Sequence, residues 1–185
     1  MPGGVSFTPS RRVPAQVPER FVDDGDEPVI RCLPQGICSW DFDLTSEGRQ
    51  ATLEVNWMSE EGAIIADGTQ FQVRKHGMFS GRWSLDQNGQ AAAVAQKRSA
   101  FMRTFDITDA MGACVLRAES AFGRGFRLER EGKVIATVIP DHAFTRRTTI
   151  EICDPQWMFS TVSFSFWLVG LIWRRAHRNN NAAQS

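Results

Sequence analysis

Basic side chains occur in short groups along this sequence, and they are the residues whose type and spacing favour binding chemistry. Clustered guanidinium and ammonium ions attract phosphate and carboxylate groups. These groups therefore predict an anion-binding face, with anionic phospholipid headgroups or an acidic protein partner as its ligand. The alternative is that they mark exposed strand edges, where charge prevents pairing with another chain. The candidate binding residues are Arg74, Lys75, Lys97, Arg98, Arg103, Arg146 and Arg147.

Residue patterns for covalent or metal chemistry are absent from the sequence. It has no P-loop, no G-x-S-x-G and no H-E-x-x-H, and Gly123-Arg-Gly125 precedes a predicted strand rather than following one. A zinc site needs ligands at short spacing, whereas the cysteines form no C-x2-C pair and the histidines are scattered. The sequence predicts no enzyme, no cofactor and no bound metal. The cysteines are Cys32, Cys38, Cys114 and Cys153, and a Cys32–Cys38 disulfide is the alternative to four reduced thiols.

The overall charge excludes a general nucleic-acid binder, because such proteins carry a basic excess. Here 21 basic residues balance 21 acidic ones, so the formal net charge is zero. With 42% hydrophobic residues, the chain is long enough to bury a core of its own. No charged-then-apolar N-terminal signal is seen. We therefore expect a cytoplasmic protein, either free or peripheral at a membrane.

Residues 157–173 form an uncharged stretch that holds three of the six tryptophans. At helical angles its serines, threonine and glycine scatter around the axis, so a helix here has no polar face and must be buried in protein or lipid. Thr161 to Phe166 alternates polar and apolar residues, which favours a strand. The length of the stretch favours a helix, because strands seldom exceed eight residues.

A membrane span is the second interpretation of residues 157–173. Tryptophans at both ends and the basic residues that follow, Arg174 to Arg178, are typical of interfacial anchors. If the basic residues stay in the cytoplasm, the residues before 157 must be exported without a signal. In the opposite orientation the basic residues must cross the membrane, against the positive-inside tendency. We therefore favour a helix buried in protein. Phe164, Trp167, Leu168 and Leu171 are then expected to be buried.

The remainder of the chain reads as a series of hairpins. An aromatic residue, an apolar residue two positions later and then a glycine recur, with apolar residues again on the return strand. A further hairpin is predicted around Asp67-Gly68, and Thr148 to Ile152 alternates as a last strand. The alanine-rich stretch 91–103 could be helical, but its place in the repeat indicates a strand and a loop. The four repeats begin at Phe42, Trp83, Phe105 and Phe126 and reach Gly48, Gly89, Gly112 and Gly132.

The ends of the chain differ from the hairpin region. Residues 1–30 are rich in proline and acidic residues and are predicted to be a disordered leader. The alternative is that this leader drapes over the domain as a strand, anchored by Val29 and Ile30. The domain is predicted to span 31–178, followed by a disordered tail at 179–185. Asp154 and Pro155 are predicted to start the helix, as its N-cap and first turn.

Four stretches resemble the tubby-like, LURP-one-related and phospholipid-scramblase superfamily. They are EGAIIADGTQFQVRK at 61–75, SGRWSLDQNG at 80–89, GRGFRLEREGKVIATV at 123–138 and FSFWLVGLIWRR at 164–175. The resemblance covers residues 40–175 and implies a closed β-barrel threaded by a central apolar helix. Tubby proteins bind phosphoinositides at basic surface residues, but those positions cannot be aligned here. The cysteine-rich and calcium-linked segments of scramblases have no counterpart.

The predicted fold class is thus mainly β, an antiparallel closed β-barrel wrapped around one C-terminal apolar α-helix. The predicted function is a non-enzymatic intracellular binding module for anionic lipid headgroups at a membrane surface. Two alternatives stay open: a structural or protein-interaction module that recruits its partner through the proline-rich leader, and a protein anchored in the membrane by residues 157–173.

Overall fold

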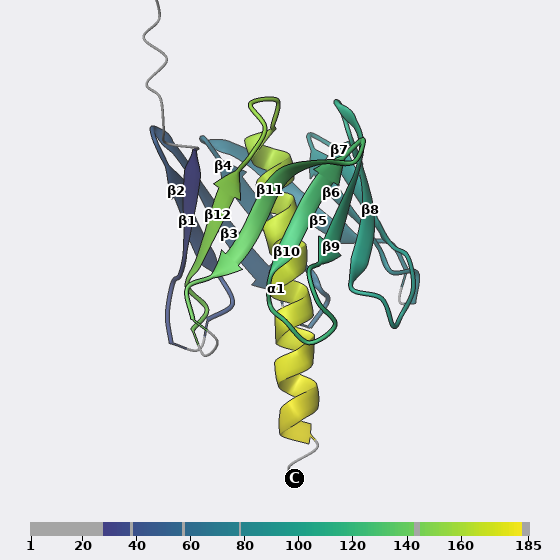
Figure 1. The fold of residues 1–185 in the computed structure, drawn as a ribbon. Coiled ribbons are helices and arrows are strands. Elements are labelled where there is room, and N and C mark those ends of the chain that lie inside the picture. The colour runs from purple at the N-terminus through teal and green to yellow at the C-terminus, as the bar shows by residue number, and fades with distance from the viewer. Residues whose placement is uncertain (1–27, 38, 57, 78, 143–144, 183–185) are drawn as a thin grey trace, which may run out of the picture.

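The computed structural model describes residues 28–182 except for 38, 57, 78 and 143–144. Over these residues the chain forms one closed antiparallel barrel of twelve strands, and a single helix, α1, runs through it (Figure 1). The predicted fold class is confirmed. The elements are β1 Val29–Pro34, β2 Phe42–Ser46, β3 Arg49–Asn56, β4 Glu61–Ala66, β5 Thr69–Lys75, β6 Arg82–Gln87, β7 Gln90–Lys97, β8 Thr104–Asp109, β9 Gly112–Ala118, β10 Phe126–Arg130, β11 Lys133–Pro140, β12 Thr148–Ile152 and α1 Phe159–Ala182.

The sheet is a meander in which each strand pairs with the next one in the chain. The predicted hairpins are all present, and 91–97 lies in β7 as a strand rather than a helix. Asp67-Gly68 forms a two-residue turn in which both residues have positive φ, 48° and 77°. Such turns match the twist of the strands that they join. β1 closes the barrel by pairing with β12, where Ile30 lies opposite Ile150.

The two ends of the domain differ from their predicted limits. Val29 and Ile30 belong to β1, so the chain is already part of the barrel before residue 31, as the anchored-strand alternative expects. α1 continues to Ala182, beyond the predicted helix end at 173 and into the predicted tail. Residues 1–27 and 183–185 lie outside the described residues.

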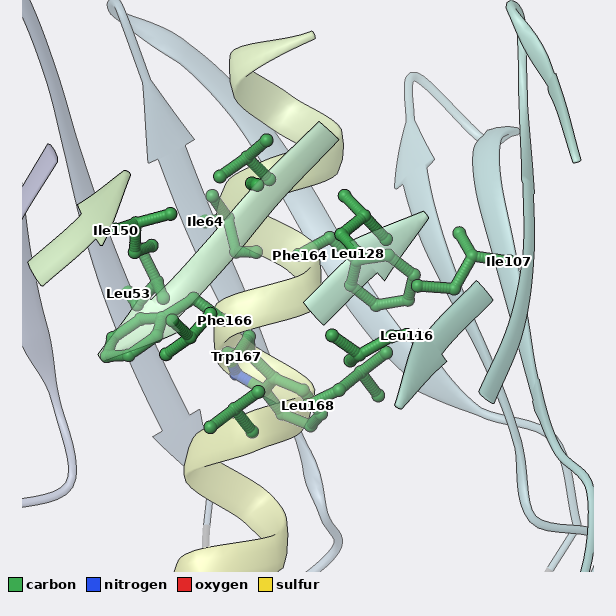
Figure 2. Close-up of a cluster of buried hydrophobic side chains, with 14 of the residues drawn as sticks. Leu53, Ile64, Ile107, Leu116, Leu128, Ile150, Phe164, Phe166, Trp167 and Leu168 are labelled. Carbon is green, nitrogen blue, oxygen red and sulfur yellow. The ribbon is translucent and has the colours of Figure 1, made fainter. Parts of the chain in front are cut away.

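The lumen of the barrel is filled by apolar side chains from the strands and from α1. Strand residues alternate between buried and exposed, so that one face of each strand lines the lumen. Phe164, Trp167, Leu168 and Leu171 of α1 are at most 1% exposed, as predicted. In Figure 2 the side chains of α1 lie among strand residues from around the barrel, which include Leu53, Ile64, Ile107, Leu116, Leu128 and Ile150.

Closure of the barrel decides between helix and strand for residues 161–166. A closed sheet has no free edge, so a segment in its lumen has no strand to pair with. Buried backbone N–H and C=O groups must nevertheless be hydrogen-bonded. A helix meets this need within the segment itself, and the alternating pattern of Thr161 to Phe166 is therefore overridden. Among the described helical residues, no stretch is both long and apolar enough to cross a membrane.

The hydroxyl groups of α1 form a small polar network near its N-terminus. Thr161 Oγ1 donates to Asp109 Oδ2 at 2.8 Å, and Ser165 Oγ donates to the Thr161 carbonyl at 2.8 Å. The Asp109 side chain is fully buried and pairs with Arg130 at 2.8 Å. Buried polar groups are tolerated when they are hydrogen-bonded, so these contacts explain Thr161 and Ser165. The buried Ser163 Oγ has no hydrogen-bond partner among the described residues.

The predicted start of the helix is wrong. α1 begins at Phe159, and its first turn is closed by the Val162 N–H, which donates to the Met158 carbonyl at 3.0 Å. Asp154 instead accepts a hydrogen bond from the Gln156 N–H at 2.7 Å, which closes a local turn. Asp154 and Pro155 thus redirect the chain from β12 towards the lumen, and they stand outside the helix.

Candidate anion-binding site

The two ends of the barrel have different connections between strands. We call the end where α1 leaves the barrel the exit end; it is the lower end in Figure 1. The connections at the opposite end are mostly two-residue turns, together with the segment 153–158 that leads into α1. The exit end carries six longer connections, which we call the exit loops. They are residues 35–41, 57–60, 76–81, 98–103, 119–125 and 141–147.

Charge is distributed unequally between the ends. We counted the described residues of each connection, the strand residues on either side of it and, for the exit end, α1 after Trp173. The exit end has eleven Arg and Lys residues against five carboxylates, whereas the opposite end has three against five. A chain with zero net charge therefore has one strongly basic end. Such a field attracts anions towards the exit end.

One recess at the exit end, of about 490 Å³, lies between the loops 76–81 and 98–103. We call it the lysine recess, because Lys75 and Lys97 line it together with Arg175. Lys75 and Arg175 both pair with Glu60, at 2.7 Å and 2.6 Å. Lys97 Nζ donates to the Ala100 carbonyl at 3.0 Å. Arg98 lines the recess as well and pairs with Asp106 at 2.7 Å. Three of its four cations are thus already paired with a carboxylate.

Glu60 has a pKa that its surroundings lower strongly. Burial alone raises the pKa of this carboxyl group, but hydrogen bonds from Arg175 and Lys75 outweigh burial and lower it from 4.5 to about 2. A carboxylate with a lower pKa in the folded protein stabilises the fold above its ordinary pKa. The contribution of Glu60 is therefore fully present above about pH 4.5 and is lost as the pH falls towards 2.

Replacing Glu60 with glutamine is expected to lower the free energy of unfolding by about 2 kcal/mol at pH 7, the usual size for hydrogen bonds to a charged group. The difference from the wild type should shrink towards zero near pH 2, where the wild-type carboxylate also loses its charge. Urea unfolding at both pH values measures this. Glu47→Gln, in an exposed turn at the opposite end, is the matched control and should change little. An equal loss at both pH values would mean that packing, not charge, is responsible.

A second recess, of about 980 Å³, lies on the side of α1 that faces the loops 35–41, 119–125 and 141–147. We call it the arginine recess. Each of its three guanidinium groups lies over an aromatic ring: Arg103 over Phe126 at 4.9 Å, Arg124 over Trp173 at 4.4 Å and Arg146 over Trp40 at 5.3 Å. Among the described residues that line the arginine recess, none is aspartate or glutamate.

The three arginines also hold the exit loops together. Arg103 donates to the carbonyls of Ala121 and Gly123, the latter at 2.6 Å, and Arg124 donates to the Thr145 carbonyl at 2.5 Å. Arg146 donates to the carbonyls of Gly36, Ile37 and Ser39. Carbonyl acceptors satisfy N–H groups without neutralising charge. These hydrogen bonds hold the three guanidinium groups on a rigid frame.

The electrostatics of the arginine recess reflect this crowding of charge. Burial, and then the neighbouring charge of Arg146, lower the pKa of Arg124. Burial likewise lowers the pKa of Arg103. The Nε1 of Trp173 and the Nε of Arg103 are buried, and neither has a hydrogen-bond partner among the described residues. An anion in the recess would relieve the repulsion between the guanidinium groups.

The structure brings together most of the predicted binding residues. Arg103 and Arg146 line the arginine recess, and Lys75, Lys97 and Arg98 line the lysine recess. Arg98 is also held in a bidentate pair by Asp106. Arg74 and Arg147 line neither recess. The Arg74 side chain, 60% exposed, pairs weakly with Asp86 at 3.5 Å, and Arg147 is exposed at the end of its loop.

Sequence reasoning missed other members of the site. Arg124 lies between the glycines of Gly123-Arg-Gly125, which was considered only as a nucleotide-binding loop. Its neighbours in the recess, Trp40, Trp173 and His177, carry no motif. One signal was available. In a meander every second connection lies at the same end of the barrel, and the C-terminus of a helix that threads the barrel lies at one of the two ends. Counting connections in this way assigns Arg124 to the same end as Arg103 and Arg146.

The described cysteines, Cys32, Cys114 and Cys153, show no feature of a reactive site. Burial, and then the charge of Asp141, raise the pKa of Cys32, while burial raises the pKa of Cys114 to about 11. Both thiols therefore stay protonated at neutral pH and pack as small apolar groups. Cys153 is exposed and unpaired. The alternative disulfide from Cys32 involves Cys38, which lies outside the described residues.

Fold and site together define a closed antiparallel barrel with a buried central helix and a basic exit end. Comparison with protein-family models, with curated proteins and with solved structures found no match to this chain.

Proposed function

We propose that this protein is a non-enzymatic binding module that holds an anionic phospholipid headgroup in the arginine recess, at the surface of a membrane. The observation that carries the proposal is the arginine recess itself, where three guanidinium groups gather and no described lining residue is a carboxylate. Arginine presents a planar fork of donors that fits phosphate oxygens. Elsewhere at the exit end, Lys75, Arg98 and Arg175 already pair with carboxylates.

The mixed character of the recess supports a lipid rather than a free inorganic anion. Its arginines alternate with Ile37, Trp40, Phe122 and Trp173. A phospholipid headgroup joins a phosphate to a glycerol backbone and acyl chains, so it offers both an anionic and an apolar part. Aromatic residues with one polar end are typical of the membrane interface. A cytoplasmic location fits this ligand, because anionic lipids give the cytoplasmic leaflet its negative potential.

Membership of the tubby-like, LURP-one-related and scramblase-like superfamily remains a proposal as well. A closed barrel around a central apolar helix supports it. The phosphoinositide binding of tubby proteins would fit the basic exit end. The site proposed here rests on the arginine recess of this chain and not on that resemblance.

Arg124→Gln is expected to weaken binding to anionic vesicles about five-fold, because a basic residue near such a surface contributes about 1 kcal/mol. Arg124→Lys, which keeps the charge, should lose less. Lys133→Gln removes one charge from a turn at the opposite end and should change binding little. Sedimentation with phosphatidylserine-containing and with pure phosphatidylcholine vesicles, at several salt concentrations, measures these effects.

The same assay separates the lipid proposal from its rivals. Wild-type binding should require the anionic lipid and weaken with salt, and it should survive deletion of residues 1–27. Binding that is lost with the leader would favour the protein-interaction alternative. Equal losses for Arg124→Gln and Lys133→Gln would mean that overall charge, and not the arginine recess, attracts the membrane. The absence of any salt-sensitive preference for anionic vesicles would overturn the proposal.

A further inference from the structure

Large apolar side chains are exposed at the tips of the exit loops. Those on described exit-loop residues are Ile37, Met58, Phe79, Phe101, Met102 and Phe122. In the connections at the opposite end, Met111 is the one described residue of this kind, and it is less exposed. Leaving such side chains in water forgoes the free energy that burial would give. Their gathering at one end therefore indicates a surface that becomes covered.

The position of α1 limits how a flat surface can meet these tips. Figure 1 shows α1 continuing past the exit loops at the lower end. A bilayer perpendicular to the barrel axis would meet the polar end of α1, with Arg178 and Asn179, before it met the loops. The protein must therefore lean, so that the loops on one side of α1 reach the surface.

The strand order identifies the two sides. Around the exit end the loops follow one another as 35–41, 141–147, 119–125, 98–103, 76–81 and 57–60. Loop 141–147, at the centre of the arginine recess, lies directly opposite loop 76–81. Ile37 and Phe122 line the arginine recess from the loops on either side of its centre. Phe79 lines the lysine recess on the far side.

We propose that Ile37 and Phe122 insert into an anionic bilayer, with the arginine recess facing it and the lysine recess turned away. This inference rests on the proposed function and assigns the docking side. The observation that supports it is that exposed apolar side chains and guanidinium groups lie at the same recess. Ile37 is 96% and Phe122 100% exposed, and both line the same recess as Arg103, Arg124 and Arg146.

A bilayer fits this arrangement better than a protein partner does. Phosphates and acyl chains lie at successive depths in a bilayer, so a surface that docks on it needs cations set back from apolar tips. Ile37 and Phe122 are single side chains on separate loops, with the loop of Arg146 between them, rather than one continuous apolar patch. Charge complementarity with anionic headgroups holds the arginine recess at the depth of the phosphates, while the Ile37 and Phe122 side chains reach the acyl chains below.

The test uses the full chain and two phenylalanines that are matched in exposure. Phe122→Ser combined with Ile37→Ser should weaken binding to phosphatidylserine-containing vesicles at least ten-fold, including at high salt, where charge contributes little. Phe79→Ser should change binding less than two-fold, although Phe79 is 95% exposed. Monomeric dihexanoyl-phosphatidylserine, below its micelle concentration, should bind the wild type and Phe79→Ser alike. The Ile37 and Phe122 variant should lose far less affinity for this soluble lipid than for vesicles, because insertion into a bilayer plays no part in binding it. Thermal unfolding checks that each variant is folded.

The possible outcomes distinguish this inference from the proposed function. Unchanged vesicle binding by the Ile37 and Phe122 variant would overturn the inference alone. So would an equal loss in Phe79→Ser, because the docking side would then be wrong. Binding of the soluble lipid but not of vesicles by the wild type would overturn insertion and leave headgroup recognition standing. Failure of the wild type to bind either form of the lipid would overturn both.

Discussion

A chain that ends at Pro155 is expected to be insoluble. This deletion removes α1, on which ten large apolar side chains are buried, and leaves the inner faces of the strands around an empty lumen. Each such side chain contributes about 1.5–3 kcal/mol through burial. Their sum, about 15 kcal/mol or more, exceeds the usual stability of a whole domain, 5–15 kcal/mol. The strands cannot compensate, because their inward faces have no other element to pack against among the described residues.

Expression of residues 1–155 beside the full chain measures this effect, with solubility and thermal unfolding as the readouts. A chain that ends at Arg175 is the control, since it keeps the buried part of α1 and removes only its projecting end. That control should stay folded. A soluble fragment 1–155 with a cooperative unfolding transition would contradict the architecture, and it would favour a membrane anchor at 157–173.

Trp167→Ala is expected to lower the free energy of unfolding by about 3–5 kcal/mol, the usual cost of removing a large buried aromatic side chain. Trp167 is 1% exposed and lies at the centre of the lumen (Figure 2). Its Nε1 donates to the Glu54 carbonyl at 3.3 Å. A Cβ atom added at Gly62 would lie 3.1 Å from Nε1. The strands of the barrel thus pack closely against this indole ring. They cannot move easily into the cavity that the Trp167→Ala substitution would create.

Urea unfolding of Trp167→Ala, compared with Trp157→Ala, tests this expectation. Trp157 is only partly buried, beside Arg49 and Phe159 at the opposite end, so its removal should cost much less. The slope of the unfolding free energy against urea should stay unchanged if both variants unfold in two states. A loss below about 1 kcal/mol for Trp167→Ala would mean that the lumen repacks, and that α1 is not the hub of the fold.

The barrel was largely predictable from the sequence because its determinants are local. Alternation of apolar residues identifies the strands, and Asp67-Gly68 identifies a turn from two residues alone. The burial of Phe164, Trp167 and Leu171 follows from the absence of a polar helix face. The start of α1 was not predictable in this way. Asp154 is a good N-cap by residue type, yet the chain needs four more residues to cross from the wall of the barrel into its lumen.

The candidate site was less predictable because it is assembled by closure of the barrel. Arg103, Arg124 and Arg146 belong to different loops and lie far from one another in the sequence. Glu60 similarly neutralises Lys75 and Arg175, which come from β5 and α1. No local pattern shows which cations pair with a carboxylate. That pairing depends on which loops become neighbours, and hence on the complete strand order.

The central position of α1 also has a consequence for biosynthesis. The ribosome makes α1 after every strand that surrounds it, and at 5–20 residues per second the 24 residues of the helix take about 1–5 s. Secondary structure forms far faster than this, so the nascent strands wait with their apolar faces uncovered. β1 meanwhile lacks its partner β12 until most of the chain has emerged. The nascent protein is thus exposed to aggregation during this interval, and early chaperone contact would benefit it.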